Sequence, residues 1–101
     1  MTVKANVHYG APIDPSHFES YFVSTHAPIA QTMPGLRTFE YGKAISNLDG
    51  TPTDTFWIAT LTFDSMEAMQ QALGSPEGQA TVADMANDAS GGATITVSEV
   101  L

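Results

Sequence analysis

The sequence predicts one α+β domain over residues 1–101, with its elements in the order β-α-β-β-α-β. Three observations predict this class. Apolar and polar residues alternate near both ends of the chain, as they do in half-buried strands. Apolar residues recur at helical spacing after two capping segments, and a turn-rich segment separates two strands in the middle. This order is the split βαβ pattern of a ferredoxin-like fold, with a four-stranded antiparallel sheet and both helices on one face.

The first half of the chain supplies a strand, a helix and a second strand. Residues 3–8 alternate in polarity and predict the first strand. Asp14 is a good N-cap and Pro15 suits the first helical position, so a helix begins there. Pro28 removes a backbone donor, so this helix is expected to end or kink at that point. The second strand is expected over residues 36–45.

The second half repeats the pattern with a turn in front of it. Asp49-Gly50 favours a hairpin, and residues 55–63 then predict the third strand. Asp64 or Ser65 caps the next helix, and Glu67 stands where it would complete a capping box with Asp64.

The second helix is predicted to be split in two. Gly74-Ser75-Pro76 stops its first piece and starts another, with the serine as cap and the proline at the first position. The apolar face of this second piece is marked by Ala80, Ala83 and Met85. Residues 93–100 alternate in polarity again and predict the last strand.

Composition excludes several classes of partner. The chain has 3 Lys+Arg against 11 Asp+Glu, a formal net charge of −8, and no cysteine. Such a surface repels phosphates, so nucleic acid and anionic membranes are not expected as partners. No secretory signal is visible, and no apolar run approaches the ~20 residues that span a bilayer. A cytoplasmic protein is therefore expected.

The third strand predicts a homodimer. Phe56, Trp57 and Ile58 are consecutive, so bulky apolar groups should point to both faces of the sheet. Because the helices cover one face, a second subunit is expected on the other. That face would be partly polar, since it would also carry Lys4, Asn6, His8, Thr94, Thr96 and Ser98.

Several short segments stand in a particular order along nearly the whole chain. They are Val7-His8-Tyr9-Gly10, Asp14…Phe18…Tyr21, His26-Ala27-Pro28-Ile29-Ala30, Pro34-Gly35-Leu36, Phe63-Asp64-Ser65-Met66-Glu67-Ala68, Ser75-Pro76-Glu77-Gly78 and Gly91-Gly92. Together they resemble the EthD family of the dimeric α+β barrel superfamily. The resemblance implies a homodimeric barrel and a link to the degradation or tailoring of small organic molecules. The EthD family is itself similar to barrels that act as cofactor-independent monooxygenases, isomerases or decarboxylases.

His26 is the sharpest candidate for chemistry. It lies on the same helix face as Phe18 and Phe22 and should point towards the sheet. An imidazole there can take or give a proton near neutral pH, and a histidine occupies the same His-x-Pro position in the resembling family. Alternatively, the ring caps carbonyls that Pro28 leaves free and has no catalytic part. Both interpretations stay open.

Large side chains near His26 predict either core or the wall of a pocket between the first helix and the sheet. Such a pocket favours a flat apolar or aromatic molecule. The candidate substrate-binding residues are Tyr9, Phe18, Tyr21, Phe22, Met33 and Trp57.

The other polar residues predict less. Asn6 and His8 form a possible second polar site on the first strand, either lining the space between subunits or facing water. The three histidines lack the spacing of a metal-binding pair, and no phosphate loop is present, so neither a metal nor a cofactor is predicted. Two functions remain: a cofactor-independent small-molecule enzyme with His26 as acid/base, or a non-catalytic dimeric binding or accessory protein.

Overall fold

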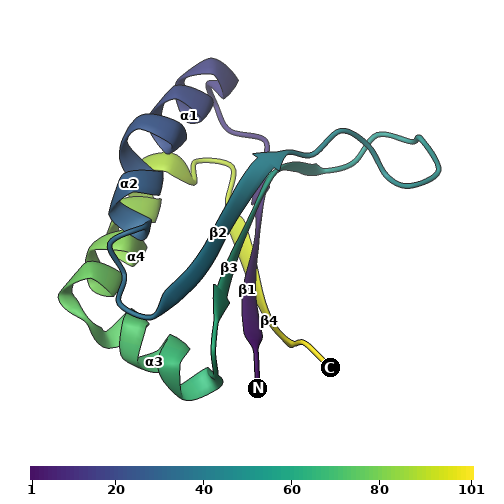
Figure 1. Cartoon of the computed structure of the whole chain (residues 1–101). Helices are drawn as coiled ribbons and strands as arrows, with labels where there is room; N and C mark the ends of the chain where they lie inside the picture. Colours follow the sequence, from purple (N-terminus) through teal and green to yellow (C-terminus); the bar gives the residue numbers. More distant parts are fainter.

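A four-stranded antiparallel sheet forms the centre of the molecule (Figure 1). The computed structural model describes residues 1–101 and contains strands β1 (Val3–Gly10), β2 (Leu36–Lys43), β3 (Thr55–Phe63) and β4 (Ala93–Glu99). The order across the sheet is β2-β3-β1-β4, so the first and third strands of the chain lie in the middle. This order confirms the predicted ferredoxin-like fold.

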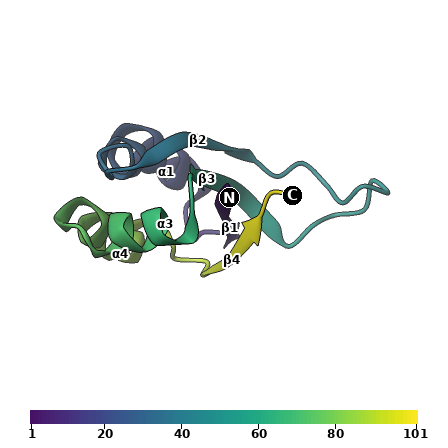
Figure 2. The same cartoon turned by 60° about the horizontal axis from the view of Figure 1, so that its bottom comes forward.

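All helices lie on one side of the sheet (Figures 1 and 2). The first helical segment runs from α1 (Pro15–Tyr21) through the π-helix η1 (Phe22–His26) to α2 (Ala27–Ala30). The second consists of α3 (Met66–Gly74) and α4 (Pro76–Asp88), so the predicted split is present. None of these helices is both long and apolar enough to cross a membrane.

Serine side chains begin the two pieces of the second helical segment. The hydroxyl of Ser65 accepts a hydrogen bond from the backbone N–H of Ala68 at 3.0 Å. Ser65 is therefore the N-cap of α3, and the predicted capping box starting at Asp64 is wrong; Asp64 instead pairs with Arg37. Ser75 caps α4 as predicted, accepting from the N–H of Gly78.

A bulge in β3 changes how its bulky residues are distributed. The register between β1 and β3 shifts after Tyr9, and Phe56 has no partner in β1. The Phe56 ring lies 5.5 Å from that of Phe18 on the helix side, where Trp57 is also buried. Bulky residues of β3 therefore do point to both faces, as predicted, but Phe56 and Trp57 share the helix side. Of the three consecutive residues, Ile58 is the one that faces the open side of the sheet, where it is 36% exposed.

Residues 44–54 form an arm between β2 and β3. Figure 1 shows the arm extending beyond the sheet on the side away from the helices. The predicted turn is present, because the N–H of Gly50 bonds to the carbonyl of Asn47 at 2.9 Å and Gly50 has a φ of 87°. Two apolar side chains on the arm, Ile45 and Leu48, are almost fully exposed.

Candidate functional site

The first helical segment changes its hydrogen-bond pattern just before Pro28. It does not end at that proline, as one of the sequence alternatives had it, but continues to Ala30. Proline has no N–H to donate to the carbonyl one turn earlier. The N–H of Ala27 bonds to the carbonyl of Phe22, five residues back, which is the π-helical pattern. His26 thus ends a π-helical turn, a feature that often occurs at functional sites.

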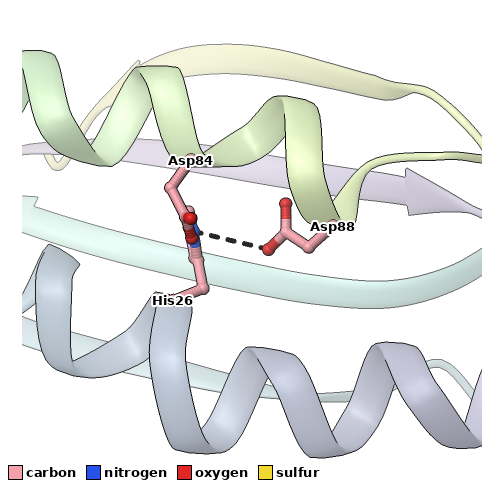
Figure 3. A group of neighbouring side chains, drawn as sticks. All are labelled: His26, Asp84 and Asp88. Atoms are coloured by element: carbon pink, nitrogen blue, oxygen red, sulfur yellow. Dashed lines mark hydrogen bonds and ion pairs between the residues drawn. The ribbon is translucent and has the colours of Figure 1, made fainter.

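His26 is buried and faces two carboxyl groups of α4 (Figure 3). Its Nδ1 lies 2.9 Å from Oδ2 of Asp84 and 3.4 Å from Oδ2 of Asp88. The ring therefore contacts side chains of α4 rather than the backbone carbonyls of its own helix. A carboxylate on Nδ1 fixes the tautomer and orientation of the ring, and it leaves Nε2 for another partner.

Asp84 is the fully bonded carboxylate of the pair. Its Oδ1 accepts from the hydroxyl of Tyr21 at 2.6 Å and from the side-chain amide of Asn87 at 3.1 Å, while Oδ2 faces His26. Burial acts to raise the pKa of Asp84, but the hydrogen bonds from Tyr21, His26 and Asn87 outweigh it and lower the pKa below its ordinary value. Asp84 is thus ionised at neutral pH.

Asp88 stands in a different environment. Its side chain is fully buried, and neither oxygen has a hydrogen-bond partner. Burial raises the pKa of Asp88 to about 6; attraction to His26 acts against this shift, and repulsion from Asp84 adds to it. The carboxyl group of Asp88 therefore releases its proton much closer to neutral pH than an ordinary aspartate does.

The sequence analysis missed both aspartates. It assigned the inward face of α4 to Ala80 and Ala83, but both are exposed and Met85 is only partly buried. The buried residues of α4 are Gly78, Thr81, Asp84 and Asp88. Their spacing follows a single helix face, and two acids four residues apart on such a face were the available signal.

A cavity of about 180 Å³ lies between the sheet and the helices, and His26 is part of its wall. The rest of the wall is almost entirely apolar. It includes exposed side chains of Leu73, Val82, Ile95 and Val97, so the cavity has an apolar opening between β4 and the second helical segment. The other lining residues are Ala5, Val7, Tyr9, Phe22, Ala30, Met33, Phe39, Ala59, Leu61, Met69, Thr81 and Met85.

The structure distributes the predicted substrate-binding residues over three places. Tyr9, Phe22 and Met33 line the cavity together with His26. Phe18 and Trp57 are buried in the core but do not line the cavity. Tyr21 lies outside the cavity wall and bonds to Asp84.

The predicted second polar site lies elsewhere. Asn6 and His8 are on the face of β1 that the helices do not cover, so they are separated from His26 by the sheet. The side-chain amide of Asn6 donates to the carbonyl of Thr96 at 3.1 Å and to the hydroxyl of Ser98 at 3.0 Å, which ties β1 to β4. The exposed His8 has no such bond.

The cluster also has the residue types of a cation site. One donor atom from each of His26, Asp84 and Asp88 lies within 4.8 Å of the others. A zinc-like ion needs donor atoms with free lone pairs about 2.0–2.2 Å away. Both oxygens of Asp84 already accept hydrogen bonds, and one of these bonds occupies Nδ1 of His26. The proton between Nδ1 of His26 and Asp84 already satisfies these two atoms. We therefore still predict that the cluster holds no metal.

The fold and the cavity define a ferredoxin-like α+β protein with an internal apolar site beside a buried histidine. The chain belongs to the EthD family, since the sequence model of the EthD domain matches residues 11–91. A relative from Rhodococcus erythropolis, described as an uncharacterized 11.0 kDa protein in the thcB-thcC intergenic region, is 41% identical over 92 residues. The match covers 91% of this chain and 88% of that protein.

Solved structures share the fold. An ethyl tert-butyl ether D (EthD) family protein from Bacillus halodurans aligns over 100% of both chains, with a TM-score of 0.92 and 28% identity. The hydroxynitrile lyase of Passiflora edulis aligns over 99% of this chain and 94% of its own, with a TM-score of 0.80 and 10% identity. A dimeric ferredoxin-like protein from Thermobifida fusca gives a TM-score of 0.74 at 10% identity, over 99% of this chain and 92% of its own. The last two likenesses concern the fold alone.

Proposed function

We propose that this chain is a cofactor-independent small-molecule enzyme, of the oxygenase, isomerase or decarboxylase type, in which His26 transfers a proton. One observation carries the proposal. His26 lines an apolar cavity while its Nδ1 is held at 2.9 Å by Asp84. A histidine oriented by a carboxylate, with its other nitrogen left for a ligand, is the arrangement of a general acid or base.

The size and charge of the site define its ligand. The cavity holds about 180 Å³, and an engineered cavity of about 150 Å³ in another protein binds benzene. The site therefore accommodates a molecule of about one ring. Asp84 and Asp88 lie just behind His26 and disfavour anions, and the apolar wall disfavours charge of either sign, so the proposed ligand is neutral.

A non-catalytic binding protein is the second candidate. The observation that favours it is the scarcity of polar atoms in the cavity wall, where Tyr9, His26 and Thr81 are the residues with hydroxyl or ring-nitrogen groups. Such a wall is sufficient to hold an apolar molecule without reacting with it.

Ligand binding and turnover separate the two candidates. Small neutral ring compounds are screened by chemical-shift changes in the isotope-labelled protein, and those that bind are incubated and analysed by mass spectrometry. The enzyme proposal expects a ligand that is converted by the wild-type protein and is bound but not converted by His26→Gln. Full conversion by His26→Gln overturns the role of His26, and binding without any conversion across the whole screen favours the binding protein.

We also propose that a second copy of the chain covers the open face of the sheet, as a dimeric α+β barrel. That face carries Ile58, and the arm of residues 44–54 extends past the sheet on the same side (Figure 1). A copy seated on the face would lie beside the arm, whose Ile45 and Leu48 are exposed. Exposed apolar groups gathered around one surface are typical of an association site.

A further inference from the structure

Few polar atoms of the cavity wall are available to a ligand. The hydroxyl of Thr81 donates to the carbonyl of Glu77 at 2.8 Å, one turn earlier in α4. Nδ1 of His26 is engaged by Asp84. The remaining groups are Nε2 of His26 and the hydroxyl of Tyr9, neither of which has a hydrogen bond within the protein. Any polar recognition inside the cavity therefore depends on these two atoms.

Tyr9 is fixed in place at the same side of the cavity as His26. Its side chain is 2% exposed, and its ring packs edge-on against Phe18 at 5.3 Å and Phe22 at 5.8 Å. The ring of His26 lies 5.1 Å from the same Phe22. Phe22 is thus a neighbour of both polar residues, and all three line the same cavity of about one ring in size.

The two groups differ in what they offer to a ligand. Burial, together with the nearby charges of Asp88 and Asp84, raises the pKa of Tyr9 far above its ordinary value. Its hydroxyl is therefore protonated at any physiological pH and can donate. A neutral imidazole whose Nδ1–H points to Asp84 carries a lone pair on Nε2 and can accept.

We infer that the cavity takes a neutral phenol, bound through its hydroxyl group between Tyr9 and His26. A donor and an acceptor that line the same small apolar cavity complement a hydroxyl, which both accepts and donates. A ketone offers only an acceptor and leaves Nε2 unpaired, whereas a carboxylate is repelled by Asp84 and Asp88. This inference rests on the proposed function and narrows its ligand to one chemical class.

The same geometry defines a proton transfer. The phenolic O–H bond breaks and an Nε2–H bond forms on His26, which gives a phenolate and an imidazolium. The imidazolium keeps its Nδ1–H on Asp84 and is stabilised by that negative charge. The phenolate oxygen accepts the hydrogen bond from Tyr9. Atoms and charge balance without a further reactant.

Calorimetric titration with phenol and toluene tests the inference, because the two molecules differ only in their polar group and are both about one ring in size. Phenol is expected to bind the wild-type protein more tightly than toluene, by about two- to tenfold for the net gain of hydrogen bonding. Tyr9→Phe should remove most of this difference and leave the affinity for toluene unchanged. Tyr41→Phe is the matched control, because Tyr41 does not line the cavity, and it should keep the difference.

The outcomes distinguish this inference from the proposed function. Equal affinities for phenol and toluene, or a Tyr9→Phe variant that keeps the preference, overturn the inference and leave the cavity as a site for apolar rings. Failure of both molecules to bind overturns the inference and the proposed ligand class together. A second readout uses 4-nitrophenol, whose phenolate has its own absorption band. The band should grow on binding to wild-type protein, and growth to the same extent with His26→Gln contradicts the proton transfer.

Discussion

The hydroxyl of Tyr21 donates to Oδ1 of Asp84 across 2.6 Å, and this bond joins α1 to α4 directly behind His26. The opposite oxygen of the same carboxylate accepts from His26. Tyr21 precedes His26 by little more than one helical turn, so one helical segment supplies two of the three partners of Asp84, the third being Asn87 of α4 itself. The carboxylate is held from two sides and in turn holds the imidazole.

Tyr21→Phe tests whether this bond keeps Asp84 ionised. Without the hydroxyl, the pKa of Asp84 should rise, because the hydrogen bond from Tyr21 is the largest of the effects that lower it. The carboxyl resonance of Asp84, followed by NMR against pH, measures this change. Tm should fall by only a few degrees, since the ring remains in place. An Asp84 titration identical to that of the wild-type protein would show that the hydrogen bond has no such effect.

Asp88→Asn tests the buried carboxyl group. The pKa of Asp88 is raised to about 6 in the folded protein, above the ordinary value of 3.8, so the folded state binds the proton more tightly than the unfolded state. Its contribution to stability is therefore fully present below the ordinary pKa and is lost as the pH rises through about 6. The asparagine side chain is neutral at every pH, so its contribution to stability does not fall as the pH rises. The stability of the variant minus that of the wild-type protein should therefore be larger at about pH 8 than at about pH 5.

Thermal unfolding at the two pH values measures this difference. Each variant is compared with the wild-type protein at the same pH, so that the titration of other carboxyl groups cancels. Asp54→Asn is the matched control, because Asp54 is exposed and caps no helix. Asp14→Asn is less suitable, because Asp14 caps α1. An Asp88→Asn variant that loses as much stability at high pH as at low pH contradicts the raised pKa.

Ile58→Asp tests the proposed dimer. Ile58 faces the open side of the sheet, so in a barrel dimer the new carboxylate would be buried without a partner, at a cost of about 3–5 kcal/mol. Light scattering should show a dimer for the wild-type protein and a monomer for the variant. Ile13→Asp, at an exposed position outside the sheet, should remain dimeric. A wild-type protein that is monomeric at all concentrations excludes the dimer.

Addition of divalent cations tests the prediction that the cluster holds no metal. Because Nδ1 of His26 is engaged by Asp84, an ion held by all three residues would have to displace that hydrogen bond. Zinc or manganese added to metal-free protein should therefore leave Tm unchanged, and elemental analysis of the purified protein should find no stoichiometric metal. A rise in Tm that Asp88→Asn abolishes would identify the cluster as a metal site.

The elements of this fold could be predicted from the sequence because their signals are local. Ser75 and Pro76 begin a helix within a few residues, and β3 has the bounds that its residues indicate. The bulge at Phe56 depends instead on the register between β1 and β3, which no local pattern of the chain contains. The sequence predicts that Pro28 disturbs its helix. In the structure the helix continues past Pro28, and its hydrogen bonds change to the π-helical pattern just before the missing N–H donor.

Of the buried cluster, only His26 could be predicted from the sequence. His26 stands out by its place beside Pro28, but its partners lie 58 and 62 residues further along the chain and meet it through the packing of α4 against η1. Helical periodicity identifies a face and does not say which face is inward. On α4 the inward face is the more polar one, because its aspartates meet a histidine there.

His26→Ala, compared with the double variant His26→Ala/Asp88→Asn, tests whether the imidazole does more than hold the fold. Removing the ring leaves Asp84 and Asp88 facing each other without the imidazole N–H that now lies between them, so the single variant should lose about 3–5 kcal/mol of stability and melt at a clearly lower temperature. Asp88→Asn in the second variant removes one of the two carboxylates, so it should restore part of the lost stability at about pH 8.

Conversion of the ligand found by screening should respond differently. A general acid or base contributes about 10²–10⁴-fold to the rate, and the asparagine cannot replace it. The double variant should therefore recover stability but not activity. Recovery of stability and activity together would mean that His26 acts through the stability of the cluster alone. A double variant no more stable than His26→Ala would show that the two carboxyl groups do not repel each other in the folded protein.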